Sequence, residues 1–442
     1  MTELPRRALG RTARLAALPL GYAGRTAVGM GRRFGGANAD AVMLDVQQRT
    51  AEQLFKTLGD LKGGAMKMGQ ALSIMESVLP EELAEPYRRQ LTKLQDSAPP
   101  MSAAVVHQQL TREFTAGWKR SIVEFDDTPA AAASIGQVHR GRWKDGREVA
   151  VKLQYPGAEQ ALMSDLRQIR RLARTFGGLV PGVDIRALAQ ELEDRVAEEL
   201  DYGLEAEAQA TFAEEFADDP SFVVPAVVAS SHRAIVTEWM DSKASLAKVI
   251  GSGTQEERDR FATLYARFMF EGPARTGLMH ADPHPGNFRV VVGDDGVERL
   301  GVLDYGAVAR LPEGTLPASL GRLMRIALHD DYDVVVQQLR DEGFIRPGIR
   351  VRAEDLKSYL GPFVDPAREE TFRFSRDYMR AELQRAQNLN TPEMQVAFRL
   401  NLPPAYLLIH RTFVGAVGVL CQLEAEVPFR RILEESMPGF GV

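Results

Sequence analysis

Residues 280–307 read HADPHPGNFRVVVGDDGVERLGVLDYGA. The β-branched runs Phe288–Val292 and Val297–Leu303 flank a Gly-Asp-Asp-Gly turn, which predicts a β-hairpin. The hairpin should return Asp304, which follows the second strand, to the side of Asn287, which precedes the first. The rest of the chain is interpreted outward from this hairpin.

The hairpin carries three oxygen-bearing side chains in a meaningful order. Asp282, Asn287 and Asp304 have the order and spacing of a kinase catalytic loop followed by a metal-binding loop. Carboxylate and amide oxygens suit Mg²⁺, which takes its remaining ligands from substrate phosphates. This pattern predicts a magnesium-nucleotide site. The alternative is a surface hairpin whose acidic residues are only solvated.

A zinc site is a second alternative at the same place. It would use His280, Asp282 and His284. Pro283 and Pro285 forbid a continuous helix, so the spacing of the two histidines does not place them on one helical face. We therefore favour magnesium.

Composition limits the remaining interpretations. The chain has 442 residues with 45% hydrophobic content, enough for two or three packed units. A net charge of −6 argues against a general nucleic-acid binder. The single cysteine, Cys421, excludes an internal disulfide and fits a reducing compartment. The apolar run Leu407–Leu420 is too short to span a bilayer and contains His410 and Arg411, so we expect a cytoplasmic or peripheral protein.

The N-terminal segment is strongly basic. Residues 1–36 carry seven arginines against one acid, Glu3. Such a segment is suited to peripheral binding of an anionic membrane surface, here the inner face, and a flexible basic tail is the alternative. Arg14 and Pro19 interrupt any apolar core of a secretory signal.

The next segment predicts helices, beginning near Ala41. It contains the sequence Lys67-x-Gly69-Gln70, preceded by Gly63 and Gly64. Glycines are costly inside a helix, so either the helix ends there or another surface packs closely against it. By itself this lysine has the ordinary interpretation of a solvated surface residue.

A second hairpin is predicted upstream of the first. Val138–Trp143 and Glu148–Leu153 form its strands, and the Ala131–Gly136 loop stands where a phosphate-covering loop would stand. Lys152 closes a Val-Ala-Val-Lys strand, a position from which a lysine reaches the α- and β-phosphates. The alternative is a strand that ends in a snorkelling lysine.

A long acidic helix is predicted over Ile185–Phe216. Kinase chemistry requires a helix-borne glutamate that holds the strand lysine, and spacing alone does not separate Glu199 from Glu205. The buried strand Ala234–Trp239 then leads into a hinge at Met240, whose backbone would meet the adenine. Mainly helical patterns follow to the C-terminus.

Six motifs in this order resemble the UbiB/AarF family of atypical kinase-like ATPases, over roughly residues 45–425. The motifs are Lys67-x-Gly69-Gln70, the loop from Ala131 to His139, Val149-Ala-Val-Lys152, Glu199 to Ala206, His280 to Asn287, and Leu303 to Gly306. The resemblance implies an α+β, bilobal protein-kinase-like fold with an N-terminal helical extension packed over the active site. We expect a basic segment over 1–40, the extension over 41–100, an N-lobe over 101–240 and a helical C-lobe over 241–442.

The resemblance also implies a role for each motif residue. Asp282 takes the place of the catalytic aspartate, Lys152 reaches the phosphates, and Glu205 pairs with that lysine. The implied metal ligands are Asn287 and Asp304. The implied nucleotide-binding residues are Ala131, Ala132, Ala133 and Ser134, which replace the glycine-rich loop, together with Lys152, Glu238 and Met240. The implied inhibitory element is Lys67, Gly69 and Gln70, with Glu199 as the partner of Lys67.

Two departures from the family pattern are visible. Tyr305 follows Asp304 where protein kinases usually have phenylalanine, which leaves the metal ligand intact. Some relatives carry C-terminal membrane helices, and no such helix is predicted here.

The expected function is that of a kinase-like ATPase that uses ATP and Mg²⁺. It would act in isoprenoid-quinone or other lipid metabolism, by ATP hydrolysis or by phosphorylation of a small or lipid substrate. One alternative is an antibiotic- or choline-type phosphotransferase, which would not need Lys67 and Glu199. Another is a non-catalytic nucleotide-binding scaffold. No nucleic-acid partner is expected.

Overall fold

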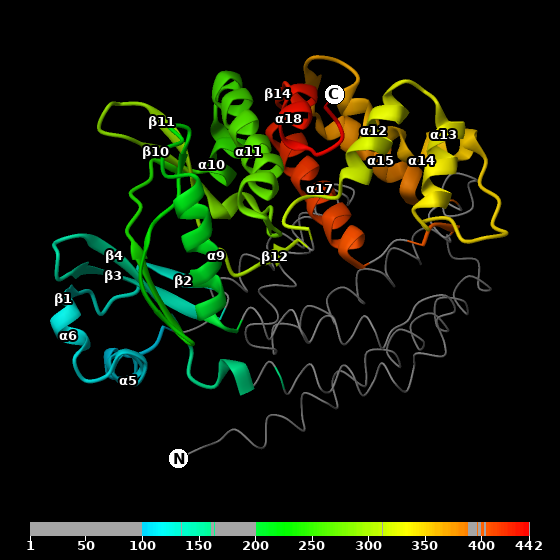
Figure 1. Ribbon diagram of the computed structural model, residues 1–442. Helices are drawn as coiled ribbons and strands as arrows, with labels where there is room; N and C mark the ends of the chain where they lie inside the picture. Colours follow the sequence, from blue (N-terminus) through cyan, green and yellow to red (C-terminus); the bar gives the residue numbers. More distant parts are fainter. Residues whose placement is uncertain are drawn as a thin grey trace, which may run out of the picture. The chain divides into compact units, whose positions relative to one another are not determined.

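A computed structural model of the chain describes residues 100–133, 135–160, 163, 200–311, 313–387, 396, 399–401 and 404–441. The predicted inhibitory element and its partner Glu199, the loop residue Ser134 and the basic segment 1–36 lie outside these residues. The described residues contain both helices and sheets (Figure 1).

The strands have the following bounds. They are β1 Ile122–Phe125, β2 Ala131–Ala133, β3 Gly136–Trp143, β4 Glu148–Gln154, β5 Phe222–Val223, β6 Val227–Ser231, β7 Ala234–Glu238, β8 Ala244–Ser245, β9 Leu278–His280, β10 Phe288–Val292, β11 Glu298–Val302, β12 Val308–Arg310, β13 Phe372–Arg373 and β14 Glu426–Val427.

The α-helices are α5 Ala103–Phe114, α6 Trp118–Ser121, α9 Tyr202–Glu215, α10 Leu246–Ser252, α11 Gln255–Thr276, α12 Ala318–Leu328, α13 Tyr332–Asp341, α14 Ala353–Val364, α15 Arg376–Gln387, α17 Pro404–Leu423 and α18 Phe429–Ser436. Two 3₁₀ turns, η2 Pro285–Asn287 and η3 Asp365–Ala367, complete the regular structure of the described residues. None of the helices in these ranges combines the length and the apolar content needed to cross a membrane.

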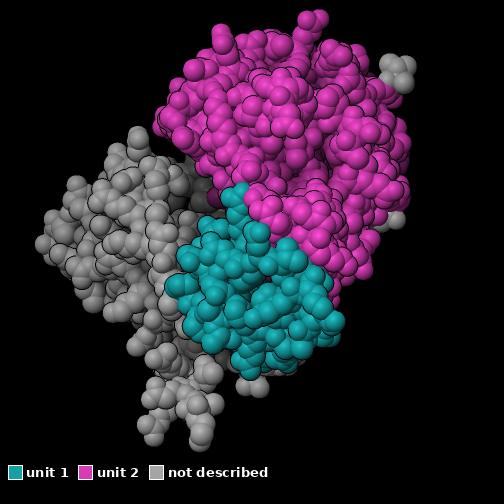
Figure 2. Space-filling view, turned by 90° about the vertical axis from the view of Figure 1, so that its left-hand side faces the viewer, with its two compact units in different colours: residues 1–73, 81–140, 152–200 teal, residues 74–80, 141–151, 201–442 magenta. Residues whose placement is uncertain are grey.

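The chain forms two compact units, which Figure 2 colours separately. Unit 1 takes its described residues from 100–140 and 152–200, and unit 2 takes them from 141–151 and 201–441. The larger sheet has the strand order β1-β3-β4-β7-β6, with β2 paired to β3, and the boundary between the units passes through β3 and β4.

The two predicted hairpins are present with small shifts at their ends. In the upstream hairpin the β3 and β4 strands meet at Gly146, whose φ of 93° suits the turn. The segment before it differs from the prediction, because Ala131–Ala133 is the strand β2 and not a loop. Ala131 pairs with Val138 and Ala133 with Gly136, so β3 supplies hydrogen bonds that a sequence pattern of small residues does not reveal.

A buried hydrogen-bond chain holds β3 in unit 1. The Met101 N–H donates to Gln137 Oε1 at 2.8 Å, which orients the amide so that its Nε2 donates to His139 Nε2 at 2.7 Å. His139 Nδ1 must then carry the ring proton, and it donates to the Asp126 carbonyl at 2.8 Å. Burial lowers the pKa of His139, so the ring is neutral in the folded protein.

This neutral ring predicts acid sensitivity of unit 1. The unfolded chain binds a proton at His139 near pH 6.5 and the folded chain only at lower pH, so stability is complete above this pH and falls below it. We expect the urea midpoint to fall less between pH 7.5 and pH 5.5 in His139→Leu than in the wild type. His329→Leu, at an exposed histidine, is the control. An equal fall in His139→Leu and the wild type would contradict the assignment.

The main core of unit 2 surrounds α11. The helix begins at a capping box, in which Thr254 and Glu257 satisfy each other's backbone N–H groups, and it ends at Gly277, whose φ is 70°. Phe268 and Met269 of this helix are buried against β9, β10 and β11, with α17 and α18 packed alongside (Figure 1). A second apolar cluster joins α12, α13 and α14. The β10–β11 hairpin therefore packs on a long buried helix.

The helix that carries Glu205 is shorter than predicted. It begins at Tyr202, because Asp201 has extended backbone angles and its side chain accepts the Gly203 N–H at 2.8 Å. The prediction of one continuous helix over Ile185–Phe216 is wrong at this point. Glu199 lies outside the described residues, so its relation to this helix stays a prediction. An N-cap aspartate favours a helix start, and the sequence analysis did not recognise Asp201 as one.

Candidate active site

The loop between β9 and β10 is held by hydrogen bonds between its side chains and its backbone, and by contacts from two helices. Asp282 Oδ1 accepts the His284 N–H at 3.2 Å, and the Asn287 amide donates to the Asp282 carbonyl at 3.4 Å. From α11, the Tyr265 hydroxyl donates to the Pro283 carbonyl at 2.8 Å. On the other side, a Cβ added at Gly415 of α17 would lie 2.7 Å from the Pro283 ring, so that helix packs closely on the loop. Asp282 and Asn287 are thereby fixed relative to each other.

The hairpin brings Asp304 to this loop, as predicted. Phe288 pairs with Val302, and the Leu303 N–H donates to the Asn287 carbonyl at 2.8 Å. The strand β12, which follows Asp304, then pairs with β9, and Val308 lies opposite His280. Both ends of the loop are therefore closed by strand pairing.

Asp304 has a strained backbone that its neighbours hold in place. Its φ is 63°, in the left-handed region, which aspartate tolerates better than most residues. His280 Nε2 donates to the Asp304 carbonyl at 3.0 Å, and Asp304 Oδ1 accepts the Gly306 N–H at 3.1 Å. Burial lowers the pKa of His280, so its ring is a neutral donor. A strained backbone of this kind is common in functional sites.

Two carboxylates converge on Gly306. A Cβ added there would lie 3.2 Å from Asp304 Oδ1 and 3.3 Å from Glu205 Oε2. Glu205, on the first turn of α9, is only 5% exposed. Glu205 is buried and Asp304 is half-buried, so two acidic side chains lie close together beside Gly306. A side chain at position 306 would make tight contacts with both carboxylates, which glycine avoids.

The predicted hinge runs alongside the hairpin. β7 ends at Glu238, and the Lys243 N–H donates to the Val290 carbonyl at 2.8 Å before β8 pairs with β10. The Met240 sulfur lies against Gly301 of β11. The Glu238 side chain is bound to Arg147 at 2.9 Å, so of these two residues Met240 is the one in contact with the hairpin.

The remaining predicted nucleotide residues belong to unit 1. Ala131 and Ala132 of β2 are exposed, and Ala133 is half-buried. Lys152 is half-buried in β4. Their roles toward a nucleotide stay predictions.

An aromatic cluster, which the sequence analysis missed, links α9 to the segment that follows β11. Phe212 of α9 lies 5.1 Å from Tyr305 and 5.5 Å from Phe268 between ring centroids, and His280 lies 5.4 Å from Tyr305. We call Phe212, Phe268, His280 and Tyr305 the aromatic cluster. It fixes the helix of Glu205 against the residue after Asp304. Aromatic residues this far apart in sequence give no local signal of contact.

The hydroxyl of Tyr305 makes no hydrogen bond within the aromatic cluster. The side chain is 1% exposed, and its oxygen has no hydrogen-bond partner among the described residues. Burial raises the pKa of Tyr305 well above its usual range, so the phenol is neutral.

We expect Tyr305→Phe to retain nucleotide binding. The free energy of unfolding should stay unchanged or rise by up to about 1 kcal/mol, because an unsatisfied buried hydroxyl is removed. Urea unfolding with and without nucleotide checks both expectations. A loss of stability above about 1 kcal/mol would mean that the hydroxyl has a partner.

The oxygen atoms that Asn287 and Asp304 offer suit magnesium better than zinc. Within the described ranges, no group of three or more His, Cys, Asp or Glu side chains is placed to hold a metal ion. His280 Nε2 is bound to the Asp304 carbonyl, and His284 Nδ1 accepts the Gly286 N–H at 3.1 Å. A cation held by Asn287 and Asp304 would take its other ligands from phosphate, as Mg²⁺ commonly does. The choice of magnesium over zinc stays a prediction.

A family model and two relatives of this chain share the description of an atypical kinase. A family model described as "ABC1 atypical kinase-like domain" matches residues 93–339. The chain is 29% identical over 403 residues to "Atypical kinase COQ8B, mitochondrial" of Rattus norvegicus, covering 88% of this chain and 72% of the relative. It is 28% identical over 443 residues to "Atypical kinase coq-8, mitochondrial" of Caenorhabditis elegans, covering 96% of this chain but 57% of the relative.

A solved structure is also similar. Rv3197 of Mycobacterium tuberculosis, determined in complex with erythromycin, is 41% identical and superposes with a TM-score of 0.70. The match covers 92% of this chain and 100% of that structure's chain.

Proposed function

The chain belongs to the ABC1 atypical kinase-like family, and from that premise we propose that it is an ATPase or phosphotransferase that binds Mg²⁺ and ATP at the loop and hairpin around Asp304. The resemblance to the UbiB/AarF family and the α+β kinase-like fold, both predicted from the sequence, are confirmed by the family match and by the likeness to Rv3197.

The convergence of two carboxylates on Gly306 carries this proposal. Glu205 comes to Gly306 from a helix and Asp304 from a hairpin end, and the carbonyl of Asn287 accepts the N–H of Leu303, the residue before Asp304. Acidic side chains at such a site would attract a cation, and the cation would in turn bind an anionic substrate. A triphosphate with Mg²⁺ satisfies both requirements.

Each residue would have a distinct task. Asn287 and Asp304 would hold Mg²⁺, and the bound cation would neutralise charge on the phosphates. Asp282 would orient the attacking water or hydroxyl, since its Oδ1 is held by the His284 N–H. The hinge backbone at Met240 would meet the adenine, and Ala131–Ala133 with Ser134 would cover the phosphates.

The substrate follows from the family resemblance. We propose isoprenoid-quinone or other lipid metabolism, with phosphate passed to water or to a small or lipid acceptor. The basic segment 1–36 would provide peripheral attachment to an anionic membrane. Lys67, Gly69, Gln70 and Glu199 would form the inhibitory element. An antibiotic- or choline-type phosphotransferase and a non-catalytic scaffold are the competing proposals.

A phosphate-fate experiment tests the proposal. Labelled ATP is incubated with the full chain and Mg²⁺, with and without liposomes and quinone precursors, and label is followed into phosphate, lipid and protein. We expect magnesium-dependent release of phosphate or labelling of the lipid fraction. Nucleotide binding without turnover under all conditions would favour the scaffold. Absence of magnesium-dependent nucleotide binding would overturn the proposal.

The proposed pair of Lys152 and Glu205 predicts a specific mutational pattern. Lys152→Ala should weaken nucleotide binding, and Glu205→Ala should have an effect that overlaps it. The double variant should then lose less than the sum of the two single losses, because residues in one interaction are not additive. Calorimetric titration with ATP and Mg²⁺ measures all three. If the two single losses of affinity add fully in the double variant, Lys152 and Glu205 are not a pair. The proposed magnesium site at Asn287 and Asp304 would be unaffected by that result.

A further inference from the structure

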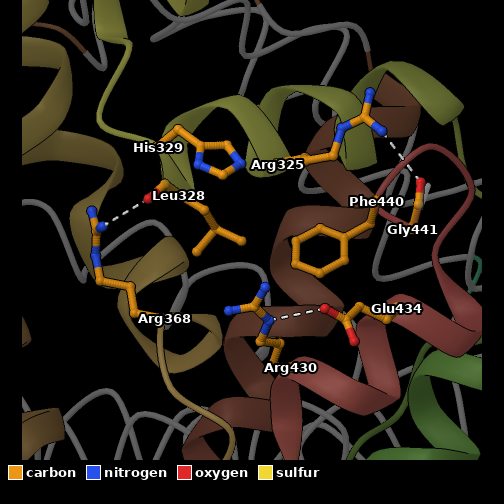
Figure 3. A pocket seen from close by; sticks show the side chains of 8 residues that line it. All are labelled: Arg325, Leu328, His329, Arg368, Arg430, Glu434, Phe440 and Gly441. Carbon is orange, nitrogen blue, oxygen red and sulfur yellow. Dashed lines mark hydrogen bonds and ion pairs between the residues drawn. The ribbon is translucent and has the colours of Figure 1, made fainter.

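A cavity of about 650 Å³ lies in unit 2, lined from α12, the end of η3, α18 and the segment that follows α18 (Figure 3). None of the predicted nucleotide or metal residues lines it. Its volume is in the range of small-molecule sites.

The cavity walls are held in place by close backbone packing. Gly321 of α12 lies against the backbone of Pro438 and Phe440, so that a Cβ at this position would collide with it. Gly439 has a φ of 78°, and the Phe440 N–H donates to the Met437 carbonyl at 3.1 Å. The segment after α18 is therefore fixed on α12, and the cavity is part of the folded structure.

Three arginines surround the cavity, and they differ in how their charge is balanced. Arg368 is bound to Asp365 at 2.9 Å and to Asp330 at 3.0 Å, which raises its pKa. Arg430 is bound to Glu434 at 2.9 Å, but both side chains are exposed, so this pair is weak. Both of these arginines therefore have a carboxylate partner.

Arg325 is the least compensated of the three. Its guanidinium contacts the Gly441 carbonyl at 3.4 Å, and no carboxylate lies within ion-pair distance of it among the residues that the structure describes. The side chain is half-buried. A partly desolvated guanidinium without a carboxylate favours a bound anion.

The cavity also has an apolar part. Leu328 and Phe440 lie between the arginines in Figure 3, and Phe440 is 3% exposed. Both side chains also pack on the apolar core of unit 2, so they give the cavity an apolar wall fixed in place. An arginine fork matches a phosphate oxygen pair, and the apolar side chains match an attached organic group.

We propose that this cavity binds a phosphate monoester with an apolar substituent, at a site separate from that of the nucleotide. The ligand is either a free metabolite or the head of an anionic lipid. Arg325 supplies the main contact to the phosphate, Arg430 the second, and Leu328 with Phe440 the contact to the substituent.

Hydrogen–deuterium exchange and calorimetry on the full chain test the proposal. The probes are inorganic phosphate, phenyl phosphate, and phosphatidylcholine vesicles with and without phosphatidic acid. We expect phenyl phosphate to bind more tightly than inorganic phosphate and to protect amides of α12 and α18. Protection of residues 282–306 instead would mean binding at the nucleotide site and would overturn the proposal.

Variants with a matched control make the test specific. Arg325→Gln should weaken phenyl phosphate about tenfold or more, the loss expected for a charge-assisted hydrogen bond. Arg431→Gln should leave the affinity for phenyl phosphate unchanged. It removes an arginine of α18 that is paired with Glu435 at 2.8 Å but does not line the cavity. Glu434→Gln should strengthen binding, which excludes misfolding as the explanation. Equal affinity in Arg325→Gln and the wild type would overturn the site.

The vesicle arm identifies the source of the ligand. Arg325-dependent binding to vesicles that contain phosphatidic acid indicates a lipid head group. Binding of phenyl phosphate without vesicle binding indicates a free metabolite. Binding of neither overturns the proposal.

Discussion

Replacing Asp304 with asparagine is expected to abolish magnesium-dependent nucleotide binding, with at least about a hundredfold loss of affinity for ATP in the presence of Mg²⁺. The substitution removes one negative charge and one of two proposed metal ligands, while the Gly306 N–H and the His280 ring still have their partners. The strained φ of 63° is also tolerated by asparagine. The fold should therefore survive, and ATP turnover should fall with binding.

Thermal-shift titration with ATP, with and without Mg²⁺, measures this effect. Asp294→Asn is the matched control, because it makes the same chemical change in the exposed turn of the same hairpin. The control should keep the full magnesium-dependent shift. An unchanged shift in Asp304→Asn would remove Asp304 from the proposed site.

Replacing Phe212 with alanine is expected to cost about 3–5 kcal/mol of unfolding free energy and to weaken nucleotide binding as well. Phe212 has no exposed surface, and a Cβ added at Gly272 of α11 would lie 3.3 Å from its ring. Its loss leaves a cavity between α9, α11 and Tyr305. Phe212 lies on the helix of Glu205 and contacts Tyr305, the neighbour of Asp304, so both carboxylates lose a common support.

Phe344→Ala separates stability from function in this experiment. Phe344 is 3% exposed and belongs to the second apolar cluster of unit 2, which contains no predicted site residue. Both variants should be destabilised by similar amounts in urea. Below the unfolding transition, only Phe212→Ala should bind ATP more weakly. Equal ATP affinity in the two variants would show that the aromatic cluster serves stability alone.

Local sequence signals predicted the two hairpins well, because each depends on neighbouring residues. Turn glycines, β-branched strands and strand ends define the β10–β11 hairpin, and its register follows from the turn. The approach of Asn287 and Asp304 follows directly from that register. The family motifs lie in the same local stretches, which explains why the sequence was sufficient to identify the kinase-like fold.

Other features depend on packing between distant segments. Ala131–Ala133 forms a strand because β3 offers it hydrogen bonds. The start of α9 at Tyr202 depends on the Asp201 cap, which competes with helical periodicity.

The sequence alone established the order of the motifs, the β10–β11 hairpin and the approach of its two ends, since turn chemistry and strand propensity act over a few residues. Only the tertiary structure placed Glu205 and Asp304 beside Gly306, joined α9 to the segment after β11 through Phe212 and Tyr305, and formed the arginine-lined cavity. Each of these three features brings together segments that lie far apart in the sequence. Their contact is determined by helix packing and burial, which leave no periodic pattern in the chain.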